Sequence, residues 1–513
     1  MDTLSLLGNG FQAALTPENI LWVLLGVLVG TMVGVLPGLG SITAVALLLP
    51  LTFGLDPLSG LIMLCGVYFG SQYGSSTTAI LVRTPDLGSI VTALDGYEMA
   101  RRGRAGPALY TAAIGSFIAG TIAIVALTFL SPVFAEFAIV FGAAEYFLLM
   151  LMALVLVATL TTGSTLKACV AALLGLWLST IGTDAATGVP RFTFGILNLT
   201  GGIDFVIIAI AFFAMSEALR MLSHTTTLAE EPREIGRITM SREDWRRSAW
   251  PWARGSVLGV IIGVLPGIGP SIANYASYIL EKTIARGERK KEFGHGAIEG
   301  VAGPEAANNA GVGGALVPMF TLSIPGSATT ALLLFVFTMH GLQPGPQLFQ
   351  TNPELIFGII ASLYVGNVAL LVLNLPMAGL FARLLLTPPV LLYAGVMAFG
   401  VLGAYALGFN EFDLTVLFVL SILGYFMEKF DFPVAVAVLA AVLGPLVEQN
   451  LGRALNIAGG SPLQMLQRPI SLGIVIVGVV VMLGPVMFRL LTRGRAAEEE
   501  QSATDDTPAP TSR

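Results

Sequence analysis

The chain has 513 residues, of which 55% are hydrophobic and only 11% are charged, and its formal net charge is −6. A soluble domain is nearer a quarter charged, so this composition excludes an ordinary soluble protein. Apolar runs of membrane-spanning length recur along the chain, and they are continuous rather than alternating at a period of two. The sequence therefore predicts an all-α polytopic membrane protein with roughly ten to fourteen membrane segments. No basic stretch with interleaved aromatic residues indicates a nucleic-acid partner.

Two short motifs occur twice in the same order, which predicts two related repeats. The sequence GVLPGLG at residues 34–40 returns as GVLPGIG at 263–269. In the same way, GSSTTAIL at 74–81 returns as GSATTALL at 326–333. Many transporters are built from repeats of inverted topology, so we expect an inverted pair here.

A polar stretch rich in arginine separates the two copies. By the positive-inside rule this stretch is expected to be cytoplasmic, and the arginines near residue 490 place the C-terminus on the same side. The acidic tail that follows is expected to be disordered. The predicted domains are a first transmembrane repeat at 1–222, a polar cytoplasmic linker at 223–254, a second transmembrane repeat at 255–491 and a disordered C-terminal tail at 492–513.

The Pro-Gly motif interrupts an apolar helix in each half. Proline lacks the backbone N–H group and glycine gives up backbone order, so together they break a helix. The first apolar helix is therefore expected to end at Pro37 and Gly38. In the second half, basic residues flank both ends of 255–280, which predicts a re-entrant hairpin with its tip at Pro266 and Gly267.

These breaks are the feature that best indicates transport. A helix broken within the membrane exposes N–H groups, which suit carboxylates, and C=O groups, which coordinate cations such as Na⁺. Hydroxyl and amide side chains nearby would add neutral ligands. The candidate residues for substrate and ion binding are Pro37, Gly38, Gly40, Gly74, Ser75, Ser76, Thr77, Thr78, Pro266, Gly267, Gly269, Glu305, Asn308, Asn309, Pro325, Gly326, Ser327, Thr329 and Thr330. Small and hydroxyl residues also pack membrane helices together, and this alternative stays open for each of them.

Glu305 ranks first among the acidic residues as a functional candidate, and it lies in the segment GPEAANN. Arg83 follows the first hydroxyl-rich motif, where it either pairs with an anionic substrate or extends to the membrane interface. No nucleophile with a nearby base and no metal-ligand spacing is found, so an enzyme is not predicted. No cofactor is expected apart from a coupling Na⁺ at the broken helices.

At several motifs the sequence resembles the large membrane subunit of the tripartite tricarboxylate transporters of bacteria. The matching stretches are GVLPGLG from Gly34, YFGSQYGSSTTAILVRTP from Tyr68, ALDGYEMARRGRAGPAL from Ala93, GVLPGIG from Gly263, FGHGAIEGVAGPEAANNA from Phe293, LSIPGSATTALL from Leu322 and HGLQPGP from His340. The resemblance implies a multi-pass protein of the bacterial inner membrane, with a small four-helix membrane subunit and a periplasmic solute-binding protein as partners. It also implies secondary import of a tricarboxylate-like anion, driven by Na⁺ or H⁺ and without an ATPase.

Two other classes of function remain as alternatives. A stand-alone carboxylate channel or exporter would share the membrane architecture but would have no binding-protein partner. A membrane-embedded enzyme would need a nucleophile–base pair or a set of metal ligands, which the sequence does not show.

Overall fold

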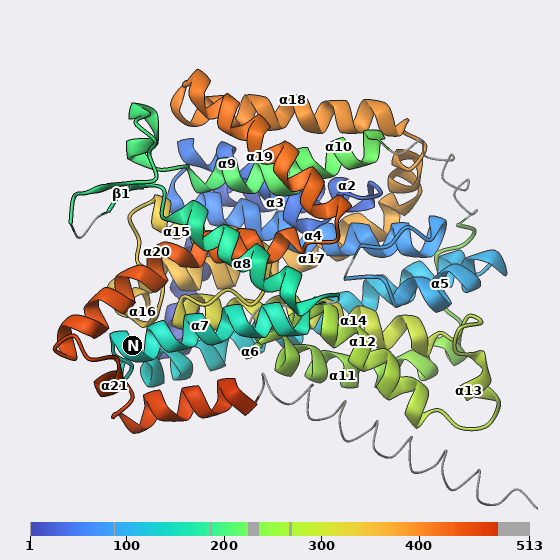
Figure 1. Cartoon of the computed structure of the whole chain (residues 1–513). Helices are drawn as coiled ribbons and strands as arrows, with labels where there is room; N and C mark the ends of the chain where they lie inside the picture. Colours follow the sequence, from blue (N-terminus) through green and yellow to red (C-terminus); the bar gives the residue numbers. More distant parts are fainter. Residues whose placement is uncertain are drawn as a thin grey trace, which may run out of the picture.

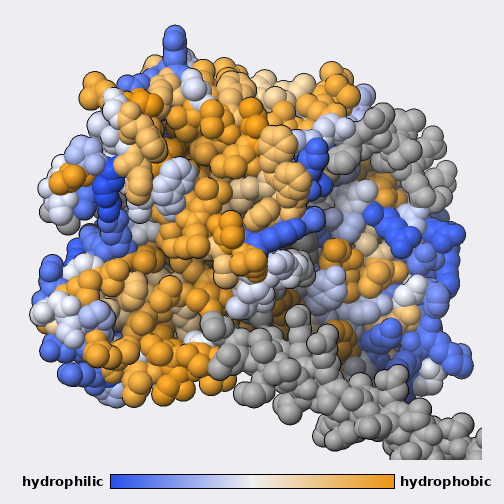
Figure 2. Space-filling view, in the orientation of Figure 1, coloured by the Kyte–Doolittle hydropathy of each residue, from blue (hydrophilic) through white to orange (hydrophobic). Residues whose placement is uncertain are grey.

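The structure, a computed structural model, describes residues 2–86, 88–161, 163–184, 187–223, 235–265 and 269–480, and it is helical almost throughout (Figure 1). Within these residues the strands are confined to one short antiparallel pair, β1 (Gly182–Thr183) and β2 (Pro190–Arg191). Figure 2 shows hydrophobic side chains over much of the surface between two more polar ends. The predicted all-α polytopic membrane fold is confirmed.

Helices of membrane-spanning length and hydropathy occur from end to end of the described chain. There are six of them: α2 (Pro17–Val35), α6 (Ala105–Ala138), the continuous segment Phe205–Ser223, α17 (Pro353–Leu384), α18 (Pro389–Gly408) and α20 (Val434–Ile457). The segment Phe205–Ser223 consists of α9 (Phe205–Ala209), a π-helical turn η3 (Ile210–Met215) and α10 (Ser216–Ser223). Five shorter apolar helices accompany them, so the chain is a multi-pass protein. The number of crossings stays a prediction.

The first structural unit consists of α2 and three elements that follow it: α3 (Ser41–Leu48), η1 (Leu49–Gly54) and α4 (Pro57–Val82). Helix α2 begins where the Thr16 hydroxyl accepts from a backbone N–H group, and it ends just before Pro37. Gly38 has a φ of +80°, a conformation that glycine adopts without strain. The chain then turns back through α3 and η1 before α4. The predicted break at Pro37 and Gly38 is confirmed.

A stripe of glycines lets α2 lie directly against α4. A Cβ atom at Gly26, Gly30 or Gly34 would lie only 2.2–2.4 Å from a backbone carbonyl oxygen of α4. Lipid tails are as apolar as leucine, so membrane helices associate through this kind of close backbone packing. The glycines therefore fix α2 against α4 up to the residue at which the Pro-Gly motif begins.

The second structural unit repeats this arrangement with α11 (Arg242–Gly263), α12 (Gly269–Ile284), α13 (Glu288–Glu292) and α14 (Glu299–Leu322). A Cβ atom at Gly255, Gly259 or Gly263 of α11 would lie 2.4–2.5 Å from a backbone carbonyl oxygen of α14. The guanidinium of Arg254 on α11 pairs with Glu281 of α12 at 2.5 Å. The start of the predicted hairpin in α11 and its end in α12 therefore lie at the same level of the molecule, as a re-entrant hairpin requires. Its tip at 266–268 lies outside the described residues.

The two units are inverted relative to each other. Helices α4 and α14 occupy equivalent places in them, and they run antiparallel, because Gln72 contacts Asn308 whereas Ser76, one turn later, contacts Glu305. Both breaks also lie at nearly the same depth. Gly34, at the first break, packs on Ser71, which is next to Gln72. Gly263, at the second, packs on Gly311, one helical turn after Asn308. The expected inverted relation is thus found, while the exact domain boundaries stay predictions.

The remaining helices surround these units: α1 (Thr3–Ala14), α5 (Thr92–Arg101), α7 (Ala143–Leu160), α8 (Thr165–Ser179), α15 (Ala328–Met339), α16 (Pro346–Thr351), α19 (Glu411–Lys429) and α21 (Pro462–Met465), with a 3₁₀ turn η2 (Leu197–Gly201). Figure 1 shows α5 and α13 at one end of the molecule and α16, α21 and β1 at the other. The arginine-rich segments of both halves meet at the first of these ends, which we call the basic end. There Arg104 pairs with Asp244 at 2.5 Å.

The two repeats also interlock at the basic end. One carboxylate oxygen of Asp95 on α5 accepts hydrogen bonds from the backbone N–H groups of Gly294, Gly296 and Ala297 at 2.8–2.9 Å. The other accepts from the hydroxyl of Tyr278 at 3.0 Å. Burial raises the pKa of Asp95 above its usual value, although these hydrogen bonds act in the opposite direction. This contact joins two of the stretches on which the family resemblance rests.

Candidate functional site

The first hydroxyl-rich motif lies within the continuous helix α4. Its four hydroxyl residues, Ser75 to Thr78, are all buried. The Thr78 hydroxyl donates to the carbonyl oxygen of Val35 at 2.7 Å, so it satisfies a carbonyl at the end of α2 beside the Pro-Gly break. The motif is therefore not a broken segment itself. It is a rigid helical surface that faces the break of its own half.

Glu305 of α14 faces this surface and is fully buried. One carboxyl oxygen is hydrogen-bonded to the hydroxyl of Ser76, and the other accepts from the hydroxyl of Thr92 at 2.5 Å. None of the ion pairs among the described residues includes Glu305. A buried carboxyl group whose side-chain partners are neutral is costly in its ionised form, so it needs a bound cation or a proton.

Amide side chains extend the contact between the halves by one helical turn. The Asn308 amide donates to the Gln72 carbonyl oxygen at 3.0 Å, and the Gln72 amide donates to the Ser41 hydroxyl at 3.2 Å. Ser41 lies 3.3 Å from the hydroxyl of Thr329, which belongs to the second motif. One hydrogen-bonded chain therefore runs from α14 through α4 and α3 to α15. We call it, together with Glu305 and Ser76, the inter-repeat network.

The second hydroxyl-rich motif starts a helix instead of lying inside one. The chain leaves α14 through Ser323, which has a φ of +57°, and passes Pro325 and Gly326 before α15. Ser327 caps α15, because its hydroxyl accepts from the backbone N–H of Thr330 at 3.2 Å while the Thr330 hydroxyl accepts from the Ser327 N–H at 2.8 Å. The second motif thus lies at a genuine helix break.

Several amide oxygens near the network are buried without a hydrogen-bond partner. They belong to Asn274 of α12 and to Asn308 and Asn309 of α14. Asn309 donates to the hydroxyl of Ser116 on α6 at 2.7 Å and also to the backbone carbonyl of Glu305 at 3.2 Å. Buried oxygens of this kind would be satisfied by a cation, a water molecule or a substrate donor.

The first Pro-Gly break borders a cavity of about 320 Å³ that carries an excess of acidic groups. Its lining includes Asp86, Glu217 and Glu428, against the single guanidinium of Arg220. Arg220 pairs with Glu217 at 2.6 Å and with Glu428 at 3.2 Å. The carbonyl oxygen of Pro37 accepts from the hydroxyl of Tyr393 at 2.6 Å. An organic anion would be repelled here, so this cavity suits cations better than a carboxylate substrate.

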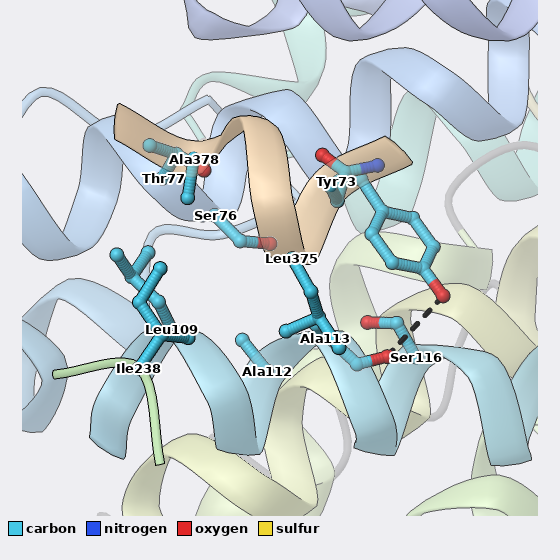
Figure 3. Close-up of a pocket in the computed structure, with 11 residues that line it drawn as sticks. Tyr73, Ser76, Thr77, Leu109, Ala112, Ala113, Ser116, Ile238, Leu375 and Ala378 are labelled. Atoms are coloured by element: carbon cyan, nitrogen blue, oxygen red, sulfur yellow. Dashed lines mark hydrogen bonds between the residues drawn. The ribbon is translucent and has the colours of Figure 1, made fainter. Parts of the chain in front are cut away.

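A second, much smaller cavity of about 20 Å³ lies beside the network, between α4, α6 and α17. Figure 3 shows Tyr73 and Ser76 of α4 facing Ala112, Ala113 and Ser116 of α6 across it. Tyr73 donates its hydroxyl hydrogen to the carbonyl oxygen of Ala113 at 3.3 Å. A cavity of this size holds about one water molecule.

The predicted residues fall into three groups. One group meets at or beside the inter-repeat network: Ser75, Ser76, Thr77, Thr78, Glu305, Asn308, Asn309, Ser327, Thr329 and Thr330, with Gly74, Pro325 and Gly326 in the same segments. A second group, Pro37, Gly38 and Gly40, lies at the first break, and Gly38 and Gly40 line the acidic cavity. In the third, Gly269 begins α12, whereas Pro266 and Gly267 lie outside the described residues.

Other residues depart from the sequence-based interpretation. Arg83 is exposed, and its guanidinium lies 5.7 Å from the ring centroid of Tyr97. It therefore takes no part in the network. Sequence reasoning missed Gln72, Ser41 and Thr92, which are single polar residues outside the repeated motifs themselves. Only Gln72 lay in a stretch already singled out, next to GSSTT.

Comparison with known proteins identifies the family of this chain. The profile of the tripartite tricarboxylate transporter TctA family matches residues 20–439. The chain belongs to this family. TctA proteins are large subunits of tripartite tricarboxylate transporters, so membership places this chain in a transporter family. The resemblance seen in the motifs is confirmed.

Two proteins of Agrobacterium vitis are similar to this TctA-family chain. The "Uncharacterized 52.8 kDa protein in TAR-I ttuC' 3'region" is 45% identical over 507 residues, which cover 99% of this chain and 100% of that one. The "Uncharacterized protein in TAR-II ttuC' 3'region" is 39% identical over 248 residues, which cover 48% of this chain and 100% of that one.

Proposed function

We propose that this TctA-family protein imports an organic carboxylate, tricarboxylate-like in size and charge, by alternating access coupled to Na⁺ or H⁺. A periplasmic solute-binding protein delivers the substrate, and a small four-helix membrane subunit completes the complex. The protein lies in the bacterial inner membrane, with its basic end and its C-terminus in the cytoplasm. The substrate and the coupling cation bind where the two repeats meet.

One observation carries this proposal. Side chains of both inverted repeats form the inter-repeat network at the depth where the Pro-Gly motifs break the helices. A site between inverted repeats can open to one side and then to the other as one repeat moves against its partner. Because most of its groups are neutral hydroxyls and amides, such a site would bind weakly enough to release its substrate.

A polar cavity at the end opposite the basic end supports delivery from the periplasm. Its volume is about 530 Å³, and its polar lining includes Ser323, Gln343, Gln347, Gln350, Gln449, Asn450 and Arg453. Arg453 makes no ion pair with any described residue, so its charge is free for a carboxylate. Ser323 links this cavity to the start of the second hydroxyl-rich motif, four residues before Ser327. The cavity would serve as the entrance.

The test is uptake of labelled di- and tricarboxylates into vesicles that contain the full chain and its small membrane subunit. Uptake is measured with and without the binding protein, under a Na⁺ gradient and under a pH gradient. The proposal predicts accumulation that needs the binding protein and one of the two gradients. Absence of accumulation of every carboxylate under both gradients would show that the proposed function is wrong.

The runner-up is a stand-alone carboxylate channel or exporter. It would share the fold but would equilibrate its substrate without a binding protein. Equal fluxes with and without the binding protein in the same vesicles would favour this alternative. Arg453, which makes no ion pair with a described residue, favours the importer, because a delivered anion needs a receiving charge on the side of this cavity.

A further inference from the structure

We propose that Glu305 carries the coupling ion as a proton, with Ser76 as the hydroxyl group that switches its hydrogen bond when the proton binds or leaves. The inference rests on the proposed function and names H⁺ as its coupling cation. Glu305 would then be neutral while the carrier reorients and ionised while the proton is exchanged with water.

The first argument is that no described residue supplies a compensating charge. Glu305 is fully buried, and its side-chain partners are the hydroxyls of Ser76 and Thr92. Moving an ionised carboxylate without a counter-ion into a low-dielectric interior is expensive, whereas a neutral carboxyl group is not. Two other fully buried carboxylates have more compensation: Glu145 pairs with Arg468 at 2.9 Å, and Asp95 accepts four hydrogen bonds. The surroundings of Glu305 therefore suit a group that is protonated for part of the cycle.

The second argument is that Ser76 has two acceptors for its one hydrogen atom. Its hydroxyl lies next to the Glu305 carboxyl oxygen and also 3.1 Å from the backbone carbonyl oxygen of Gln72. When Glu305 is ionised, Ser76 donates to the carboxylate. When Glu305 is protonated, its O–H donates to the Ser76 oxygen, and Ser76 donates to the carbonyl of Gln72. Both protonation states are thus satisfied without any movement of the backbone.

The third argument is access for water. Ser76 lines the cavity of about 20 Å³ shown in Figure 3, together with Tyr73 and Ser116. One water molecule there would meet several polar partners, as buried waters require. On the other side, Thr92 lies two residues after Ile90, which lines the acidic cavity at the first break. Glu305 is therefore hydrogen-bonded on one side to Ser76, which lines the small cavity, and on the other to Thr92, which is close in sequence to the lining of the acidic cavity.

Several other titratable groups on the neighbouring helices have partners of their own. Asp95 of α5 is held by the backbone and by Tyr278 of α12. The charged pairs nearest along α14 are Arg247 with Glu299 and Arg254 with Glu281, which join α11 to α14 and to α12. On α6, Tyr110 packs against Trp245, and α15 and α16 contain no titratable residue. This leaves Tyr73 of α4 as the group beside Ser76, and its hydroxyl donates to Ala113.

The direct test is infrared spectroscopy of the purified full chain between about pH 5 and pH 9, which covers the range of perturbed carboxyl groups. A protonated carboxyl band is expected to titrate in the wild type and to vanish in Glu305→Gln. It is expected to shift in frequency in Ser76→Ala, which keeps the carboxyl group but removes one partner. The matched control, Glu145→Gln, should keep the band unchanged. A wild-type protein without a titrating band that depends on Glu305 would overturn the proposal and leave carboxylate transport untouched.

The transport test separates proton movement from carboxylate movement. In vesicles with the small subunit and the binding protein, Glu305→Gln should lose accumulation of labelled citrate under a pH gradient. Its exchange of internal for external citrate should fall by less than its pH-driven accumulation, because a permanently neutral group permits reorientation. A wild type that accumulates citrate only under a Na⁺ gradient would assign the unpaired amide oxygens to sodium and overturn the proton proposal. Absence of uptake of every labelled carboxylate by the wild type under both gradients would instead contradict the proposed function itself.

Discussion

The hydroxyl-rich motif occupies different places in the two repeats. In the first repeat the glycine stripe of α2 reaches α4 at Ser71, and the motif follows at once within the same helix. In the second repeat the stripe of α11 reaches α14 at Gly311, but α14 continues to Leu322, and the motif starts the separate helix α15. Nearly identical sequences thus lie on a rigid helix in one half and at a helix break in the other.

This difference assigns different tasks to the two motifs. In the first repeat, Ser75 and Ser76 donate to a carbonyl of their own helix, and Ser76 also reaches the second repeat through Glu305. In the second repeat, Ser327 and Thr330 satisfy the open start of α15, and only Thr329 and Ser327 reach the first repeat. The first motif is therefore a fixed surface that faces the second repeat. The second is placed where a helix end can be released and formed again.

The largest expected effect tests what the repeats share. Gly30→Val and Gly259→Val would each force a side chain against a backbone carbonyl, at a point where even a Cβ atom would lie 2.4 Å from the oxygen. We expect each to destabilise the protein by about 3 kcal/mol, the upper range for overpacking. The measurement is the thermal unfolding of the purified full chain in detergent.

The control for this prediction is Gly379→Val, because nothing lies within 4 Å of a Cβ atom at Gly379. If the stripes are equivalent, the two stripe variants will unfold at similarly reduced temperatures. A normal unfolding temperature for either one would show that the two repeats do not pack alike.

The next effect tests what the repeats do not share. Ser76→Ala leaves the buried Glu305 with one hydrogen-bond donor fewer. It should lower the free energy of unfolding by about 1–3 kcal/mol, as for other buried polar groups that lose a partner. Thr329→Ala removes one long hydrogen bond of 3.3 Å to Ser41 and should cost about 1 kcal/mol or less. Both are measured by unfolding and by uptake of labelled carboxylate per folded protein. Equal losses in the two variants would argue against the difference between the motifs.

Much of the architecture could be predicted from hydropathy and from the repeated motifs. The Pro-Gly break after α2 and the hairpin of α11 and α12 followed from a helix-breaking pair and from flanking charge. Sequence similarity alone, however, predicted equal roles for the two hydroxyl-rich motifs. It could not show that α4 continues as a helix through GSSTT, because the same residues are found at caps and within membrane helices.

The site was predictable only where its residues stood in motifs. Glu305, Asn308 and Ser76 stood out because polar groups in an apolar sequence are costly and therefore few. Their partners Thr92 and Ser41 did not, because a single hydroxyl residue carries no periodic signal. The acidic cavity at the first break could not be predicted either, because Asp86, Glu217 and Glu428 come together only through the packing of distant segments.

The smallest expected effect concerns the start of α15. Ser327→Ala removes the hydroxyl that accepts from Thr330 and also the contact with Tyr68 at 3.1 Å. The lost cap should lower the free energy of unfolding by about 1 kcal/mol. Ser327→Gly also loses the Tyr68 contact, but its capping cost should be only a few tenths of a kcal/mol, because glycine is tolerated at this position. Tyr68→Phe isolates that contact.

If the helix end is released during transport, Ser327→Ala will change the rate of uptake more than Tyr68→Phe does at equal folded amounts. If both variants transport alike, α15 keeps its cap throughout the cycle, and the difference between the motifs is one of packing alone.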